Sequence, residues 1–187
     1  MTMPTFSLIL STGILIILAA TTLTILGYFF SKKAKSFLLK QDYFNYIKII
    51  GGLAISSTVL ALIYQLYYLL PVCILCWWQR IFIFPIDIVV LTSVYMRNKM
   101  NHITIAILAA FGAGIAAYHY YFHYQAWVLG NVVSLPCEQG GLLPGCIENN
   151  GVLTFGFVTI PFMALTVLLS IMWLCFIAHQ VTKKNNN

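Results

Sequence analysis

Apolar residues dominate five long stretches of this chain, and the polar residues gather in the short segments between them. A helix that crosses about 30 Å of hydrocarbon needs roughly 20 predominantly apolar residues. Because backbone groups find no water inside a bilayer, each stretch is expected to be an α-helix. The five predicted spans are residues 7–30, 47–70, 77–95, 103–124 and 152–178.

The composition supports this interpretation, since 61% of the 187 residues are hydrophobic and 7% are charged. An ordinary soluble domain has about a quarter of its residues charged. These values exclude a soluble globular enzyme, a disordered tail and a small secreted disulfide scaffold. The basic residues flank apolar spans and form no stripe of their own, so nucleic acid is not an expected partner. The predicted fold class is an all-α integral membrane protein with five transmembrane helices.

The distribution of Lys and Arg predicts the orientation, because cytoplasmic loops carry an excess of both. With five spans, nine of the ten basic residues fall on one side, which we take as cytoplasmic. The N-terminus is then outside and the C-terminus inside. The first span is preceded by no Lys or Arg and followed by Lys32, Lys33 and Lys35, so we expect a retained helix and not a cleaved signal peptide.

Cys73 and Cys76 form a C-x-x-C motif after Pro71, at the outer start of the third span. Two cysteines at this spacing close a tight ring that exchanges readily. If the span begins near Cys76, Arg80 lies one helical turn further on the same face. Its guanidinium, together with the helix N-terminus, would stabilise a thiolate. The pattern favours a redox site over an inert structural disulfide.

The second pair, Cys137 and Cys146, lies in the loop before the fifth span, on the same outer side. Glycines and a Pro-Gly step make this loop rich in turns, and exposed flexible disulfides exchange readily. The segment by itself is equally compatible with a structural staple. A structural zinc site usually has two close pairs, so the wide second spacing and the oxidising side argue against zinc. Cys175, within the fifth span, is predicted to act as a small hydrophobe.

Polar residues inside the predicted spans need partners. Asp87 lies two turns beyond Arg80, and we hypothesise that it meets a His or Tyr of the fourth span, with a purely structural bond slightly favoured. His119 and His123 lie four residues apart, a spacing also seen at metal and haem sites. A place in an aromatic belt is the favoured explanation for His123, and a functional role stays open for His119.

Tryptophans are expected at the outer interface, where amphipathic rings are enriched. They would also form a flat apolar slot beside Arg80, suited to a ring-shaped, lipid-soluble oxidant. These residues are Trp77, Trp78 and Trp127.

The stretch 73–80, Cys-Ile-Leu-Cys-Trp-Trp-Gln-Arg, resembles the C-x-L-C-x-x-[EQ]-R signature of the disulfide bond formation protein B (DsbB) family. Residues 82–86, with Pro85, look like the continuation in its BdbC-like branch. Residues 117–119 and 155–161 are similar to later family segments. The resemblance covers roughly residues 47–178. It implies a four-helix bundle with an outer cysteine loop, preceded by an extra helix and basic link at 1–46 and followed by a polar tail at 179–187.

The resemblance also implies a function: oxidation of a thioredoxin-like thiol oxidase on the outer face of a bacterial plasma membrane, with electrons passed to ubiquinone or menaquinone. A partner thiolate would attack Cys137 of the Cys137–Cys146 disulfide. The loop pair would be reoxidised by Cys73–Cys76 through a Cys73–Cys146 bridge. Cys76 would then deliver two electrons to a quinone.

The same resemblance implies which residues bind the quinone. Arg80 would polarise and hold it, with His119 as a second quinone-side residue. Trp77, from the expected slot beside Arg80, is the third residue predicted to bind the quinone. Two alternatives remain at this point. One is a membrane adaptor or channel with two structural disulfides. The other is a quinone-linked reductase resembling vitamin K epoxide reductase, although the C-x-x-C of those enzymes is usually placed later in the bundle.

Overall fold

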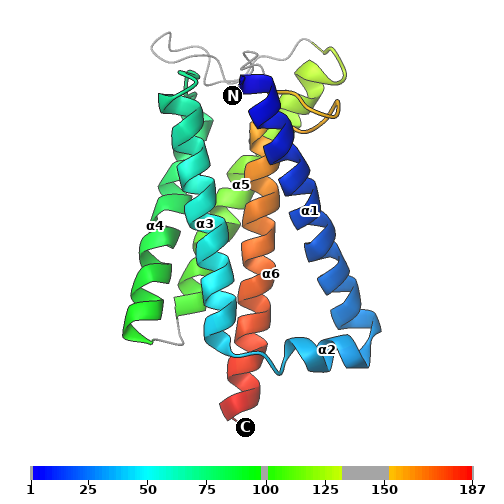
Figure 1. Ribbon diagram of the computed structural model, residues 1–187, viewed down its shortest axis with the longest axis vertical. Helices are drawn as coiled ribbons and strands as arrows, with labels where there is room; N and C mark the ends of the chain where they lie inside the picture. Colours follow the sequence, from blue (N-terminus) through cyan, green and yellow to red (C-terminus); the bar gives the residue numbers. More distant parts are fainter. Residues whose placement is uncertain (1, 98–100, 132–151, 187) are drawn as a thin grey trace.

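The structure, a computed structural model, describes residues 2–97, 101–131 and 152–186. Five of its helices are long and apolar enough to cross a membrane. Figure 1 shows them side by side, with the N-terminus and C-terminus at opposite ends of the bundle. The helices are α1 (Met3–Phe30), α2 (Lys32–Leu38), α3 (Tyr43–Leu66), α4 (Ile74–Met96), α5 (Asn101–Trp127) and α6 (Ile160–Asn186).

Four helices, α3 to α6, form a closed ring in which each helix packs against two neighbours. Small residues allow close approach, as expected where packing and not hydrophobicity drives helix association in a membrane. A Cβ at Gly51 would lie 2.6 Å from Val90 Cγ1, and one at Gly112 would lie 3.2 Å from Leu168 Cδ1. These glycines let α3 meet α4 and let α5 meet α6. The predicted all-α fold of a four-helix bundle plus one helix is confirmed.

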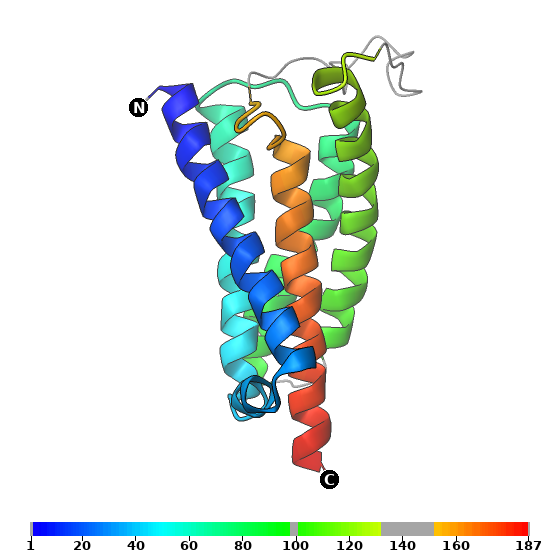
Figure 2. The same cartoon turned by 90° about the vertical axis from the view of Figure 1, so that its right-hand side faces the viewer.

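The extra helix α1 packs against α6, outside the four-helix ring. Near the end of α1, Tyr28 packs against Trp173 of α6 with ring centroids 5.6 Å apart. Figures 1 and 2 show that α2 turns back at this end of the bundle and leads to α3. Ser31 ends α1 and caps α2, with its Oγ accepting from the backbone N–H of Ala34 at 3.3 Å. The short basic helix α2 was not predicted, because seven residues with three lysines carry no spanning signal.

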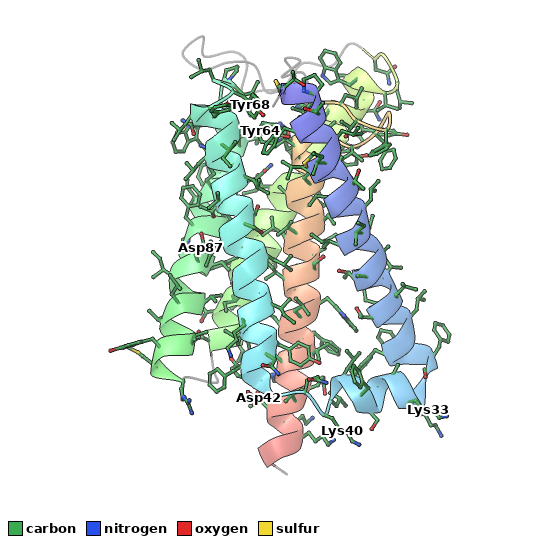
Figure 3. All side chains as sticks on the ribbon, in the orientation of Figure 1. Lys33, Lys40, Asp42, Tyr64, Tyr68 and Asp87 are labelled. Carbon is green, nitrogen blue, oxygen red and sulfur yellow. The ribbon has the colours of Figure 1, made fainter. Side chains whose placement is uncertain are left out.

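The two ends of the bundle differ in charge. We call the end where α4 begins at Ile74 the dithiol end, and the end that carries α2 and the C-terminus of α6 the basic end. Lys33 and Lys40 lie at the basic end (Figure 3), as do Arg97 and Lys183 at the ends of α4 and α6. The orientation of these ends relative to the cell stays a prediction.

The boundaries of two spans differ from the predicted ones for local reasons. The second span lies four residues earlier because Asp42 caps it, with Oδ2 accepting from the backbone N–H of Phe44 at 3.3 Å. The predicted start of the fifth span at residue 152 is wrong, since α6 begins at Ile160. Residues 154–158 form a tight turn instead, in which Phe155 and Gly156 have φ values of 52° and 76°. A helix cannot continue through that left-handed pair.

Candidate redox site

The C-x-x-C motif forms the first turn of α4. Leu69, with φ 53°, and Pro71 end the connection from α3, and Cys73 is the N-cap residue of the new helix. The two cysteines face each other as thiols, with Cys73 Sγ donating to Cys76 Sγ at 3.3 Å. An S–H donor and the positive end of the helix dipole both favour negative charge on the acceptor sulfur. Cys73 is buried and Cys76 is partly exposed, so the acceptor sulfur is the more accessible of the two.

His119 reaches Cys73 from α5. The Nε2 atom of His119 lies 3.8 Å from Cys73 Sγ, and both residues are buried, with 1% and 2% of their surface exposed. Gln79, one turn along α4 from the cysteines, places its Nε2 3.1 Å from the other ring nitrogen, Nδ1. With an amide donor at Nδ1, the neutral imidazole carries its proton on Nε2, the atom that faces the sulfur. Gln79 thus orients a proton donor toward Cys73.

These contacts act on the protonation of Cys73 in opposite directions. The hydrogen bond to Cys76 and burial raise the pKa of the Cys73 thiol to about 12, while the hydrogen bond with His119 opposes this shift. Burial disfavours a charged sulfur, and a donor bond to that sulfur favours it. Cys73 is consequently protonated at neutral pH in the reduced protein.

Arg80 is buried inside the bundle, with 8% of its surface exposed. Its Nη1 donates to Gln65 Oε1, and its Nη2 donates to the Ala61 carbonyl at 3.2 Å. Both acceptors belong to α3 and both are neutral. A guanidinium has five N–H donors, more than these two bonds use. A charge held this deeply by neutral partners is typical of a functional site in a membrane protein.

Two cavities meet at Cys76. The larger, of about 370 Å³, lies between α1, α3, α4 and α6, and Cys76, Gln79 and Arg80 line it together with many aliphatic side chains. The smaller, of about 20 Å³, is lined by Cys76, His119, His123 and Trp127, by residues 152 and 153 before the turn, and by residues 159–161 at the start of α6. Cys76 and Ile160 line both spaces, and Cys76 is the one of the two that carries a reactive group.

The structure brings together some of the predicted site residues and separates others. Of the three residues predicted to bind a cofactor, Arg80 lines the larger cavity, whereas His119 contacts Cys73 and lines the smaller one. Trp77 is 43% exposed and lies against Arg80, whose Cζ is 5.3 Å from the ring centroid. The larger cavity has a mainly aliphatic wall without the three tryptophans, and Trp127 lines the smaller cavity, so the tryptophan slot stays a prediction. Cys137 and Cys146 lie outside the described residues.

Asp87 has a different partner from the one expected. Its Oδ2 accepts a hydrogen bond of 2.7 Å from Thr58 Oγ1 on α3, so the hypothesis of a His or Tyr partner on the fourth span is wrong. Figure 3 shows Asp87 on α4, well below the dithiol end. Its other oxygen, Oδ1, is buried without a hydrogen-bond partner among the described residues. The side chain faces α3 because residues seven apart share a helix face, and Arg80 faces α3 too.

Three side chains at the dithiol end could also hold a metal ion. The ligand atoms of Cys73, Cys76 and His119 all lie within 4.8 Å of one another. Two thiolates and an imidazole suit a thiophilic cation such as Zn²⁺, with a fourth position left for another ligand. This set is available only in the reduced protein, because a disulfide removes both thiolates.

Two residues of the site were missed at first. Gln79 belongs to the signature quoted above, and its position one turn after Cys76 could have marked it. Gln65 is a polar residue near the end of an apolar span, which is itself a sign of function or of a buried partner. Its contact with Arg80 forms only when α3 packs on α4. The spacing of residues along the sequence could not predict it.

These features define a multi-pass membrane protein that carries a thiol pair, a histidine and a buried arginine at one end of a helical bundle. The family described as Disulfide bond formation protein DsbB matches residues 46–180. The chain belongs to the DsbB family and is a disulfide bond formation protein. The match begins near the start of α3, so α1 and α2 precede it.

Curated relatives carry consistent names. SPbeta prophage-derived disulfide bond formation protein B of Bacillus subtilis (strain 168) is 32% identical over 112 residues, or 60% of this chain and 70% of that protein. Probable disulfide formation protein C 2 of Bacillus anthracis is 28% identical over 141 residues, covering 75% and 94%. Disulfide bond formation protein C of Bacillus subtilis (strain 168) is 30% identical over 109 residues, covering 58% and 74%. No solved structure matches the chain.

Proposed function

We propose that this protein is a thiol:quinone oxidoreductase. It accepts electrons from a thioredoxin-like dithiol partner on the outer face of a bacterial plasma membrane and passes them through two cysteine pairs to a membrane quinone. The observation that carries this proposal is the position of Cys76 between two cavities. One cavity is apolar and of ligand size, and the other adjoins the segment that follows the Cys137–Cys146 loop.

The larger cavity fits a quinone in size and in polarity. Its volume of about 370 Å³ is within the usual range for small-molecule sites. Cys76, Gln79, Arg80 and Gln65 supply polar groups at one end, and mainly aliphatic side chains, with Ser56 and Ser57, line the rest. A bound quinone supplies an acceptor for two electrons and two protons. Arg80 would donate hydrogen bonds to its carbonyl oxygen, and the same charge would stabilise the Cys76 thiolate.

Two thiol–disulfide exchanges transfer the electrons from the partner to the loop pair and then to Cys73 and Cys76. A partner thiolate attacks Cys137 Sγ and breaks its bond to Cys146, and the second partner thiol then releases Cys137. The partner becomes a disulfide, and the loop pair gains two electrons and two protons. The loop thiols then reduce the Cys73–Cys76 disulfide by the same chemistry. Cys73 retains a proton in the reduced pair, and His119 faces its sulfur.

The proposed orientation places the N-terminus and the dithiol end outside the cell and the basic end in the cytoplasm. The charge distribution supports it, since the lysines of α2 and the C-terminal tail lie together at the basic end. The dithiol end then faces the compartment in which disulfides persist.

The test is quinone reduction by the purified full-length protein in lipid nanodiscs. A reduced thioredoxin-like oxidase serves as electron donor, and the absorbance of the quinone is followed for the wild type and for Cys76→Ser. We expect turnover in the wild type and the background rate in the variant. Wild-type protein that exchanges with no partner and reduces no quinone would overturn the proposal and favour a membrane adaptor with two structural disulfides.

A further inference from the structure

The helix α1 is docked on the family bundle by polar contacts, and is not merely an apolar anchor. Its hydroxyl-bearing side chains pair with α3, with α6 and with the turn before α6. Hydrogen bonds between membrane helices stabilise their association and fix the rotation of a helix about its axis. The pairs are Ser7 with Tyr64, Ser11 with Thr154, Thr21 with Ser170 and Thr24 with Trp173.

This docking turns one face of α1 toward the larger cavity. Ile9, Gly13 and Ile17 are among the α1 residues that line it. Residues 9 and 17 are eight apart, so this wall extends for about 12 Å along the helix. Because α1 packs on α6 and not closely on α3, the cavity occupies the space between α1 and α3. Figure 1 shows these two helices diverging below the dithiol end.

Aromatic side chains close the space above the cavity. Phe6 of α1 packs against Tyr64 and Tyr68, with ring centroids 5.5 Å and 5.3 Å apart. Tyr64 also donates a hydrogen bond of 3.0 Å to Ser7 Oγ. Figure 3 places Tyr64 and Tyr68 beside the first turns of α1. A ligand that reaches Cys76 therefore extends away from this cluster, toward the middle of the membrane.

The polarity of the cavity changes along its length. Five of its polar lining groups lie near the dithiol end: Cys76, Gln79 and Arg80 in the first two turns of α4, and Tyr64 and Gln65 at the end of α3. Deeper in the bundle the lining is mainly aliphatic, with Ile17, Leu53 and Leu168 beside Ser56 and Ser57. A polar ring at one end and an aliphatic tail at the other match this gradient. Without α1, the aliphatic part would open to lipid, because the remaining walls belong to α3, α4 and α6.

Gly13 lies at the centre of the α1 wall. A Cβ added there would meet no heavy atom within 4 Å. The position has room for a side chain, and a large one would occupy the cavity from the α1 side. Glycine in a helix interior makes a helix less stable than alanine does, so its presence here is not explained by helix stability.

We propose that α1, a helix outside the region matched by the family, forms the wall of a binding site for the isoprenoid tail of the quinone, and that Gly13 keeps this site open. The inference rests on the proposed function, because it assigns the tail of the same ligand. It adds a residue that determines specificity for tail length, while the reacting groups stay on α4.

The experiment compares Gly13→Phe with Gly114→Phe. Gly114 is also a helix-interior glycine with open space around its Cβ, but it lies on the exposed face of α5. Binding of two probes to the protein in nanodiscs is measured by equilibrium dialysis: ubiquinone-0, which has no tail, and ubiquinone-2, which has two isoprene units. We expect the wild type to bind ubiquinone-2 at least about tenfold more tightly, because the tail buries apolar surface.

In Gly13→Phe we expect this preference to disappear, and in Gly114→Phe we expect it to remain. A Gly13→Ala variant tests the same site with one methyl group and should lose only part of the preference. Thermal unfolding of each variant identifies any that fail to fold. If Gly13→Phe retains the preference, or if the wild type binds both probes equally because a lipid chain fills the site, the inference is wrong. If the wild type binds neither probe, the proposed function itself fails.

Discussion

The two ends of the bundle bury the same kinds of side chain but arrange them differently. At the dithiol end, Cys73 contacts Cys76 and His119 and lies next to a ligand-sized cavity. At the basic end, His102 Nε2 lies 3.1 Å from His179 Nδ1, and the Tyr43 hydroxyl lies 3.4 Å from His102 Nδ1. Cys175 is buried on α6, one helical turn from His179.

The comparison shows that burial and hydrogen bonding are not sufficient for redox chemistry. Disulfide exchange needs a second thiol within reach and access to a reaction partner. Cys175 has neither a neighbouring cysteine in the sequence nor a place on either cavity wall described above. We interpret the basic end as a hydrogen-bonded core, and the dithiol end as the reactive one.

The largest effect is expected from substituting one buried cysteine at each end. Cys73→Ala removes the other cysteine of the C-x-x-C motif, so Cys76 can form no disulfide within the motif. Turnover with a thiol donor and quinone should therefore fall to the background rate. Cys175→Ala removes a buried sulfur of similar exposure and should retain the wild-type rate. Equal losses in both variants would mean that the two ends do not differ in the way proposed.

Arg80→Gln should have the next largest effect. Hydrogen bonds from a charged donor contribute about 1.5–3 kcal/mol, which corresponds to a loss of about 10- to 100-fold in kcat/KM for quinone. Arg97→Gln, at the exposed end of α4, removes the same charge outside the cavity and is the matched control. Steady-state kinetics with varied quinone measures both. If kcat/KM is unchanged in the Arg80 variant, Arg80 does not contact the quinone.

His119→Gln tests the protonation of the reduced pair. The hydrogen bond from His119 lowers the pKa of Cys73 against the larger upward effects of Cys76 and burial. Removing the imidazole should therefore raise this pKa further, leave less thiolate at a given pH and slow alkylation of Cys73 by about two- to tenfold. Mass spectrometry of iodoacetamide-treated reduced protein between pH 7 and pH 10 follows the reaction.

The control for this experiment is His102→Gln, which removes a buried histidine at the basic end. It should leave the alkylation profile of Cys73 in place, because His102 lies at the opposite end of the bundle. If the pH dependence of Cys73 alkylation is unchanged in His119→Gln, the imidazole has no influence on the Cys73 sulfur.

Much of the fold could be predicted because a bilayer imposes a minimum length on apolar helices. All five spans are present, and the pair Cys76 and Arg80 lines one cavity as the spacing of four residues indicated. The end of a helix depends on weaker local signals. The turn at Phe155 and Gly156 delays α6 by eight residues, although the side chains before it are apolar enough for a span.

Contacts between helices could not be predicted from one sequence. The bond between Asp87 and Thr58 depends on how α4 is rotated against α3, which periodicity leaves open. The role of α1 was hidden for a similar reason. Ile9 and Ile17 have the composition of a lipid-facing surface, and only the packing of α1 on α6 shows that they also line a cavity.

The smallest effect is expected from Tyr43→Phe at the basic end. This change removes the hydroxyl that contacts His102 and retains the ring, which packs edge-on against the imidazole at a centroid distance of 5.7 Å. Loss of one hydrogen bond of this kind costs about 0.5–1.5 kcal/mol, so we expect a slightly lower thermal midpoint. Turnover and the alkylation of Cys73 should match the wild type, because no exchange step passes through this end. A change in the redox readouts larger than the change in stability would mean that the basic end takes part in the reaction, and the distinction between the two ends would have to be abandoned.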